Sequence, residues 1–175
     1  MYDNSTKKKG CALMFTKNCN ITDKNEAYKQ ILLQLPILLD DAPNKISALC
    51  NTCALLNVYL EDINWVGFYL MEKGTLVLGP FQGLPACSKI ALGSGVCGTS
   101  ALEKKIYCVP DVHQFPGHIA CDGNSRSEIV LPLIVDKSVV AVLDIDSPCL
   151  NRFDKTDESY LSQIVQLLAN QLYEK

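Results

Sequence analysis

Hydrophobic residues recur with a helical period near both ends of the chain and with a period of two in its middle. The first helical segment starts at Asp23 and Glu26, a pairing typical of a helix N-terminus. Pro36 is expected to end or kink this helix. A second helix follows Pro43, and a third closes the chain. The apolar faces of these three helices comprise Tyr28, Ile31, Leu32 and Leu35, then Ile46, Leu49, Cys50 and Cys53, then Leu161, Ile164, Val165, Leu168 and Leu172.

The middle of the chain has the alternation and the turn residues of β-strands. Two hairpins are predicted, one from strands 65–70 and 75–79 and one from strands 129–135 and 139–145. Short strands are expected at 89–92 and 106–109, a short helix at 99–103 and a long loop at 110–127. Because adjacent strands are joined by tight turns, the sheet should be mostly antiparallel, with about six strands. The fold class is α+β, with helices from both chain ends on one face of the sheet.

Length and composition narrow the functional classes. The 175 residues suffice for one domain, predicted over 21–175 after a flexible N-terminal extension over 1–20. A net charge of −3 argues against nucleic acid as a partner. No apolar run approaches the roughly 18 residues of a membrane span, so no membrane partner is expected. Without a recognisable export signal, the cytoplasm is the default location.

The two faces of the predicted strands differ in chemistry. In the first strand, Trp65 and Tyr69 point to the face opposite Val66, Phe68 and Leu70. In the last strand, Asp144 and Asp146 point to the face opposite Leu143 and Ile145. Carboxylates two residues apart on one strand lie ~7 Å from each other. On a solvated face they would be ordinary. Under the loop 110–127, together with Glu128, they would form an acidic pocket that favours a bound ammonium group.

The nine cysteines have different contexts. Cys50 and Cys53 form a C-x-x-C pair, but both fall on the apolar face of a helix and no second ligand pair follows, which favours core residues over a zinc or thioredoxin-type site. Cys87, Cys97 and Cys121 each lie in or beside a loop with glycine or proline. Thiols on accessible loops can act as nucleophiles, although many are inert. No metal site is predicted.

Several segments together resemble one known family. Residues 65–69, 79–83, 93–98, 109–112, 115–121, 125–130 and 143–147 are similar to the motifs of the free methionine-(R)-sulfoxide reductases, which are stand-alone GAF-domain enzymes. The resemblance extends from about residue 25 to 172 and includes three cysteines with their flanking residues. It implies a GAF-like fold with a loop-covered pocket on the sheet face opposite the helices.

The resemblance also implies a reaction. Cys121 aligns with the cysteine that attacks the sulfur of free methionine (R)-sulfoxide and becomes a sulfenic acid. Cys87 aligns with the resolving cysteine, which would form a disulfide with Cys121, and Cys97 aligns with a third, auxiliary cysteine. Thioredoxin would be the external reductant, with no bound cofactor. A homodimer is compatible with the resemblance.

Further family positions would bind the substrate. Glu128, Asp144 and Asp146 align with acids that bind it and polarise or protonate the sulfoxide oxygen, so Glu128 is also a catalytic candidate. Trp65 and Tyr69 align with aromatics around the methyl end. The alternatives are a non-catalytic GAF-type sensor of a small molecule or of oxidants, and a structural zinc protein built on Cys50 and Cys53.

Overall fold

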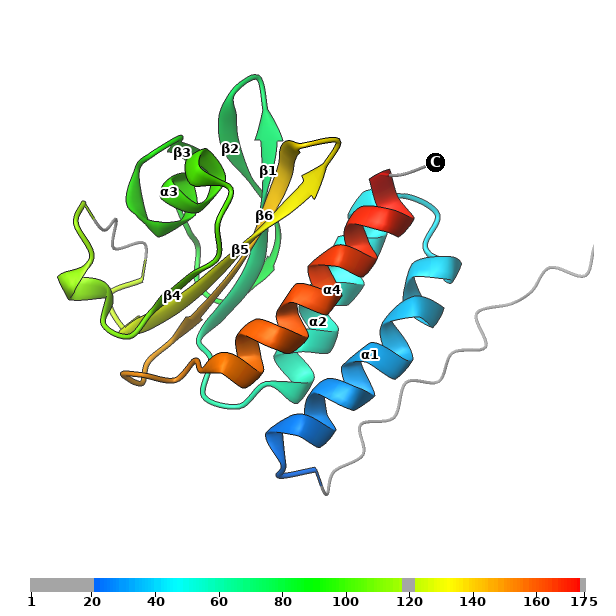
Figure 1. Cartoon of the computed structure of the whole chain (residues 1–175). Helices are drawn as coiled ribbons and strands as arrows, with labels where there is room; N and C mark the ends of the chain where they lie inside the picture. The colour runs from blue at the N-terminus through cyan, green and yellow to red at the C-terminus, as the bar shows by residue number, and fades with distance from the viewer. Residues whose placement is uncertain (1–20, 118–121, 174–175) are drawn as a thin grey trace, which may run out of the picture.

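A six-stranded antiparallel sheet forms the centre of the protein (Figure 1). The computed structural model describes residues 21–117 and 122–173. The strands run β3-β2-β1-β6-β5-β4 across the sheet, and every pair is antiparallel. Their bounds are β1 Trp65–Glu72, β2 Thr75–Gln82, β3 Lys89–Ala91, β4 Tyr107–Val109, β5 Ser127–Val135 and β6 Ser138–Ser147. The predicted α+β class and sheet are confirmed.

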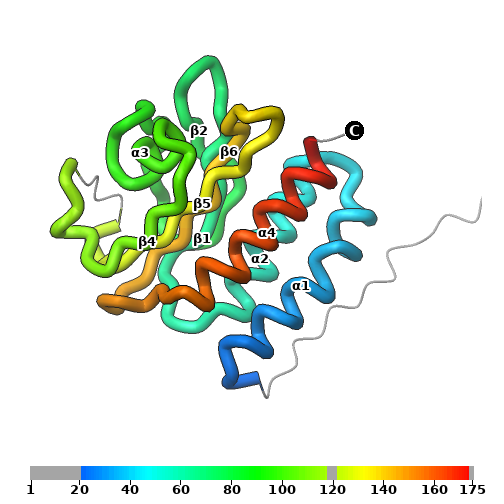
Figure 2. Tube along the Cα trace, in the orientation of Figure 1, coloured from blue at the N-terminus to red at the C-terminus, as the bar shows by residue number. Residues whose placement is uncertain are grey.

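Helices occupy both faces of the sheet unequally. The long helices α1 (Lys24–Asp41), α2 (Lys45–Tyr59) and α4 (Lys155–Tyr173) lie on one side, with α2 and α4 next to the sheet and α1 outside them (Figures 1 and 2). The short helices α3 (Gly95–Glu103) and η1 (Val112–Gln114) lie on the other side. The helices from the two chain ends therefore cover one face, as predicted, and the opposite face carries α3 and η1.

Two hydrophobic clusters follow this division. The larger one lies between the sheet and the long helices and includes Val66, Phe68, Leu143 and Ile145. The smaller one lies on the opposite face around Trp65, Tyr69, Cys97 and Val112. The predicted faces of β1, with Val66 and Phe68 on one side and Trp65 and Tyr69 on the other, are thus confirmed.

The turns and helix starts have clear local causes. Both hairpin turns use consecutive residues of positive φ, Lys73 with Gly74 and Asp136 with Lys137, as expected for tight turns that match strand twist. Asp23 accepts a hydrogen bond from the Glu26 backbone N–H at 2.9 Å and so caps α1 as predicted.

The structure corrects two details of the predicted helices and shows that α1 does not end at Pro36. α1 continues through Pro36 to Asp41, because the turn beyond the proline buries Leu39 in the core. α2 does not use the predicted face: Ile46 and Cys50 are exposed. Its apolar residues surround the helix, so spacing alone did not identify the buried side, which contains Ala48, Leu49, Thr52, Cys53, Leu55, Leu56 and Tyr59. α3 begins four residues early, at Gly95.

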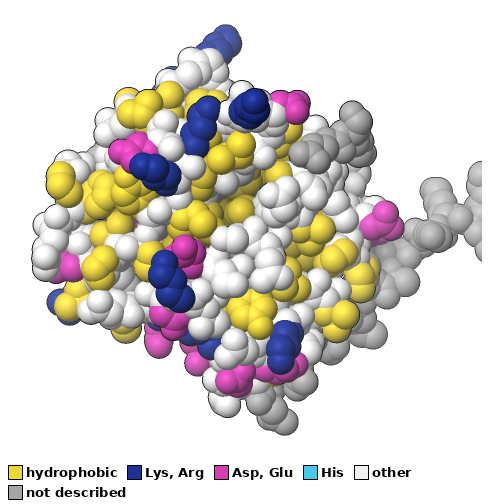
Figure 3. Space-filling model, in the orientation of Figure 1, with side chains coloured by type: hydrophobic (Ala, Val, Ile, Leu, Met, Phe, Trp, Pro, Cys, Tyr) yellow, Lys and Arg dark blue, Asp and Glu magenta, His cyan; other side chains and the backbone are white. Residues whose placement is uncertain are grey.

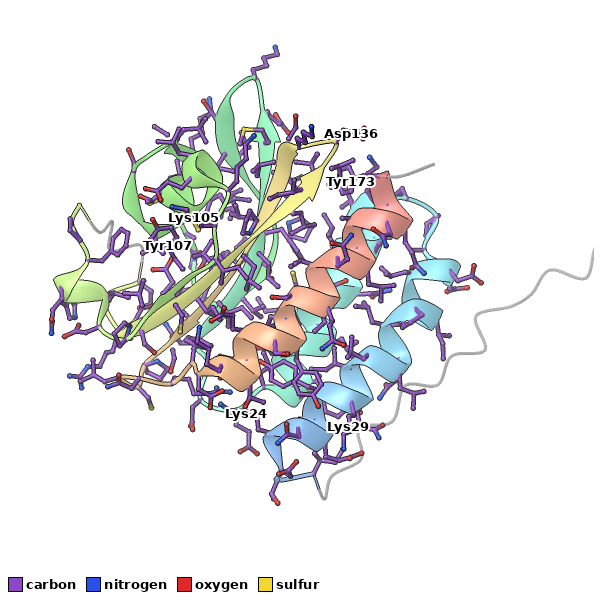
Figure 4. All side chains as sticks on the ribbon, in the orientation of Figure 1. Lys24, Lys29, Lys105, Tyr107, Asp136 and Tyr173 are labelled. Atoms are coloured by element: carbon purple, nitrogen blue, oxygen red, sulfur yellow. The ribbon has the colours of Figure 1, made fainter. Side chains whose placement is uncertain are left out.

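A buried ion-pair network joins α1 to the start of α4. The Asp157 side chain is fully buried and accepts from the Lys24 ammonium at 2.7 Å and from the Tyr28 hydroxyl at 2.8 Å. Arg152 Nη1 lies 3.2 Å from the same carboxylate. Figure 4 shows Lys24 at this junction. Burial and the Asp157 charge raise the pKa of Tyr28, which keeps its hydroxyl a hydrogen-bond donor.

The outer surface mixes both signs of charge. On the face in Figure 3, Lys and Arg side chains lie beside Asp and Glu side chains, so this face lacks the continuous basic surface that nucleic-acid phosphates require. Within the described residues, no helix combines the length and hydropathy needed to cross a membrane. The predicted extension 1–20 lies outside the described residues.

Candidate active site

Sheet register brings the predicted acids together. β6 lies between β1 and β5, and Asp146 is paired with Trp65 on one side and with Glu128 on the other. Asp144 is paired with Gly67 and Val130 in the next row on the same face. Side chains directly opposite on antiparallel strands have Cβ atoms about 4.5–5.5 Å apart. Three carboxyl groups therefore share one small area on the sheet face opposite the long helices.

These acids line a cavity of about 40 Å³. Trp65, Tyr69 and Cys97 line the same cavity, with residues 84–86, 90, 94–96, 122 and 125. Glu128 is 5 % exposed and Asp144 is 7 % exposed, so the acids are not on a solvated surface. None of the described lining residues is a lysine or an arginine. The sequence left open whether these acids lie on a solvated sheet face or in an acidic pocket, and the structure shows the pocket.

The aromatic side chains hold the segment that carries Cys87. Trp65 Nε1 donates to the Leu84 carbonyl at 3.1 Å, and the Tyr69 hydroxyl donates to the Cys87 carbonyl at 3.0 Å. The Trp65 ring stacks on Tyr69 and on Phe81. Cys87 itself is half-buried against this cluster. The two aromatics thus act both as a wall of the pocket and as anchors for the 83–88 segment.

Gly67 makes room for this wall. A Cβ added at Gly67 would lie 2.4 Å from Trp65 Cη2 and 2.5 Å from Phe81 Cβ. The Trp65 ring therefore lies across the backbone at Gly67, the residue paired with Asp144. Only glycine permits this approach, so the sequence of β1 itself sets the position of the indole above the acids.

Burial perturbs all three acids in the same direction. Desolvation, followed by the charges of Asp144 and Asp146, raises the pKa of Glu128 well above its ordinary value. Desolvation raises the pKa of Asp144 to about 6, while hydrogen bonds from Cys97 and Glu128 lower it. The Asp146 pKa is also raised, mainly by burial and then by Asp144. Burial and the neighbouring acids therefore favour the protonated form of Glu128, which donates a hydrogen bond to the Asp144 carboxyl group.

Cys97 lies in this acid cluster as a thiol. The sequence places it in an accessible glycine-rich loop, but its side chain is buried in the first turn of α3. Desolvation and the neighbouring charges of Asp144 and Glu128 raise its pKa well above the ordinary value. Its S–H donates to Asp144. A neutral buried thiol is a poor nucleophile, which fits the auxiliary rather than the attacking position implied by the resemblance.

The predicted nucleophile, Cys121, lies outside the described residues. The residue that follows it, Asp122, accepts a 2.7 Å hydrogen bond from Asn64 Nδ2, which also donates to Ser125 Oγ at 3.0 Å. Ser125 in turn hydrogen-bonds Asp146. The sequence analysis did not identify Asn64 or Ser125. The only signal was their proximity in sequence to Trp65 and Glu128.

The C-x-x-C pair is not part of the site. Cys53 is buried, and its Sγ lies 3.2 Å from the Pro80 carbonyl oxygen. Burial, with a smaller effect of Cys50, raises the pKa of Cys53 to about 12. Among the described residues, the single cluster of metal-ligating type is Cys97, Glu128 and Asp144. The structure thus provides no zinc-ligand cluster on α2.

The antiparallel sheet has long helices on one face and an acid-lined cavity on the other, and the sequence model of the GAF domain matches residues 52–172, so the protein is of the GAF class. The chain is 49% identical over 146 residues to the free methionine-R-sulfoxide reductase of Escherichia coli, covering 83% of this chain and 88% of that protein. The Neisseria meningitidis free methionine-R-sulfoxide reductase, solved in complex with its substrate, is 39% identical with a TM-score of 0.86 and coverage of 91% and 96%. The Staphylococcus aureus fRMsr complex with substrate is 50% identical, with a TM-score of 0.79 and coverage of 83% and 95%.

Within the GAF class, this chain belongs to the free methionine-R-sulfoxide reductase family.

Proposed function

We propose that this protein reduces free L-methionine (R)-sulfoxide to methionine with cysteine thiols and is recycled by thioredoxin. The observation that carries the proposal is the cavity in which three carboxyl groups, one thiol and two aromatic rings converge. A free amino acid supplies the ammonium group that such a cavity needs, and a methionine sulfoxide within a polypeptide has none at this position. Family membership supports the same substrate.

Each part of the substrate has a matching group. The ammonium pairs with the carboxyl oxygens of Asp144 and Asp146, and none of the described lining residues is a lysine or arginine that would compete for them. The methyl end lies against Trp65 and Tyr69. The sulfoxide oxygen accepts the proton of Glu128, because sulfoxide oxygen leaves sulfur only after protonation and the buried carboxyl group is held in its acid form.

The thiol steps balance without a bound cofactor. Cys121 attacks the sulfoxide sulfur and forms a transient S–S bond. The protonated oxygen then passes from that sulfur to the Cys121 sulfur as the S–O and S–S bonds break, so methionine leaves and Cys121 becomes a sulfenic acid. The Cys87 thiol then attacks the sulfenic sulfur, which forms a disulfide and releases water. The thioredoxin dithiol reduces this disulfide by exchange. Cys97 remains a thiol beside Asp144 and supports the acid cluster.

The test is turnover with separated sulfoxide isomers. With thioredoxin, thioredoxin reductase and NADPH, the protein should consume free L-methionine (R)-sulfoxide, leaving the (S) isomer and peptide-bound sulfoxide unchanged. Cys121→Ser should have no measurable turnover, whereas Cys87→Ser should release one methionine per chain without recycling. Cys108→Ser, an exposed cysteine on β4, is the matched control. If the wild-type protein bound the sulfoxide without turning it over, the result would refute the reductase and support a non-catalytic sensor.

A further inference from the structure

Three side chains with metal-ligating atoms meet in the cavity. Cys97 Sγ and a carboxylate oxygen from each of Glu128 and Asp144 lie within 4.8 Å of one another. The three residues come from α3, β5 and β6, so their positions are set by the helix start and the sheet register rather than by a loop. All three are buried. The arrangement is a pre-formed set of one sulfur and two oxygen donors.

Asp144 carries a separate sign of a missing ligand. Its Oδ1 atom is buried and has no hydrogen-bond partner, and the residue lines the cavity. A buried carboxylate oxygen without a partner is energetically unfavourable and is rare in folded proteins. A cation placed in the cavity would satisfy this atom. The volume of about 40 Å³ exceeds the ~10–15 Å³ that one buried water requires, so an ion with a water ligand fits.

The donor set selects among cations. Mg²⁺ and Ca²⁺ prefer oxygen ligands alone, whereas Zn²⁺ accepts both thiolate and carboxylate. Zn–S and Zn–O distances of ~2.3 and ~2.0–2.2 Å give ligand separations of roughly 3.3–3.8 Å in a tetrahedral site. From the 4.8 Å limit, the three donor atoms therefore need to approach one another by at most about 1.0–1.5 Å.

We infer that the cavity binds one Zn²⁺ ion through Cys97 Sγ and one carboxylate oxygen each of Glu128 and Asp144, and that the bound ion excludes the amino-acid substrate. Binding displaces the thiol proton of Cys97 and the carboxyl proton of Glu128, and no oxidation or reduction occurs. A water completes the coordination. The metal site stands on the geometry alone, whereas the inhibitory effect rests on the proposed function. Zinc is thus a reversible inhibitor of the reduced protein, not its cofactor.

The binding test uses the reduced full-length chain with a non-chelating reductant. Calorimetric titration with Zn²⁺ should give one tight site, and Cys97→Ser and Asp144→Asn should each weaken it roughly 100-fold or more, since even supporting residues of metal sites cost 10–100-fold. Co²⁺ serves as a spectroscopic probe, and its sulfur charge-transfer band should be lost in Cys97→Ser. Circular dichroism verifies that both variants fold.

Two further variants locate the ion. Cys108 is exposed and lies near the acids Glu158 and Asp157, so Cys108→Ser is the matched control and should retain the site. Cys121→Ser should also retain it. Wild-type affinity in Cys97→Ser, or loss of the tight site in Cys108→Ser or Cys121→Ser, would overturn the inference because the ion would then be held by other thiols.

Kinetics separate the metal inference from the proposed function. Zinc should raise the apparent KM for the sulfoxide without changing kcat, as expected for an ion that competes for one cavity. Turnover that is insensitive to zinc at saturating metal would refute the inhibitory site and leave the reductase intact. A wild-type chain that binds zinc through Cys97 and Asp144 but turns over no sulfoxide would refute the reductase and leave the metal site intact.

Discussion

The acid cluster should make the protein less stable as pH rises from 4 to 8. The pKa of Asp144 is raised from an ordinary 3.8 to about 6 by burial. A raised carboxyl pKa means that the folded chain binds the proton more tightly than the unfolded chain does. The stabilisation is therefore complete below the unfolded pKa and is lost as pH rises through about 6. Two pKa units correspond to about 3 kcal/mol.

The same direction holds for Glu128 and Asp146, whose pKa values are also raised by burial. Because the three carboxyl groups interact, the pH dependence belongs to the cluster rather than to one residue. Asp154 acts in the opposite direction, since its ion pair with Lys24 lowers its pKa to about 2. Its contribution is lost only below pH 4, so the window from pH 4 to 8 reports the cavity.

Asp144→Asn removes the charge and keeps an oxygen that can accept from Cys97. The variant should be about 1–3 kcal/mol more stable than the wild type at pH 7.5 and nearly equal to it at pH 4.5, measured by urea unfolding across this range. For a chain of this size the gain corresponds to a Tm increase of roughly 2–12 °C. Glu72→Gln, at the exposed end of β1, is the control and should change stability by no more than about 0.5 kcal/mol.

An Asp144→Asn variant that follows the wild-type pH profile without added stability would refute the reasoning. It would mean that the carboxyl group is already charged and satisfied in the folded protein, which contradicts the unpaired Oδ1 atom. Loss of stability at every pH would instead indicate that Asp144 is a structural hydrogen-bond acceptor. Either result would also weaken the case for an ammonium site.

Three further predictions test the acid, the β1 geometry and the helix junction. Glu128→Gln should lower kcat in the coupled assay about 10²–10³-fold with intact folding, and unchanged kcat would exclude it as the general acid. Gly67→Ala should displace Trp65 and raise KM for the sulfoxide. Because Trp65 is the single tryptophan of the chain, its fluorescence spectrum should shift. An unshifted spectrum with a normal KM would contradict the packing argument. Asp157→Ala should reduce the unfolding free energy by about 3–5 kcal/mol, measured in urea, with Tyr28→Phe costing about 1–2 kcal/mol; a stable Asp157→Ala would show that the network contributes little.

The sheet could be predicted from the sequence because its signals are local. Tight turns at Lys73-Gly74 and Asp136-Lys137 require antiparallel hairpins, and the alternation in β1 identifies its two faces. The C-terminal end of α1 could not be predicted from the sequence. Pro36 is locally unfavourable in a helix, and the helix continues beyond it because Leu39 is buried in the tertiary structure. The buried side of α2 had no signal either, since its polar residues do not form a stripe.

The residues of the candidate site could be predicted, but their burial and protonation could not. The resemblance identified Glu128, Asp144 and Asp146, and the strand pattern predicted that the last two share a face. Neither signal indicates whether the side chains on that face are buried from solvent. The burial of these acids depends on the strand register, which pairs Asp146 with Glu128, and on the residues that cover this face of the sheet. The same burial turns Cys97 from an accessible loop thiol into a neutral one, and local sequence contains no signal for that change.

The position of Cys97 bears on which cysteine can act as the nucleophile. A thiol beside two buried carboxyl groups resists ionisation, so the attacking thiolate must form elsewhere. Cys87 is held on a different segment by the Trp65 and Tyr69 hydrogen bonds, at the half-buried rim of the aromatic cluster. The environment that keeps Glu128 protonated for the sulfoxide oxygen is thus unsuited to generating a nucleophile. Acid and nucleophile need separate surroundings, which favours a nucleophile other than Cys97, in agreement with the resemblance that aligns Cys121 with the attacking cysteine.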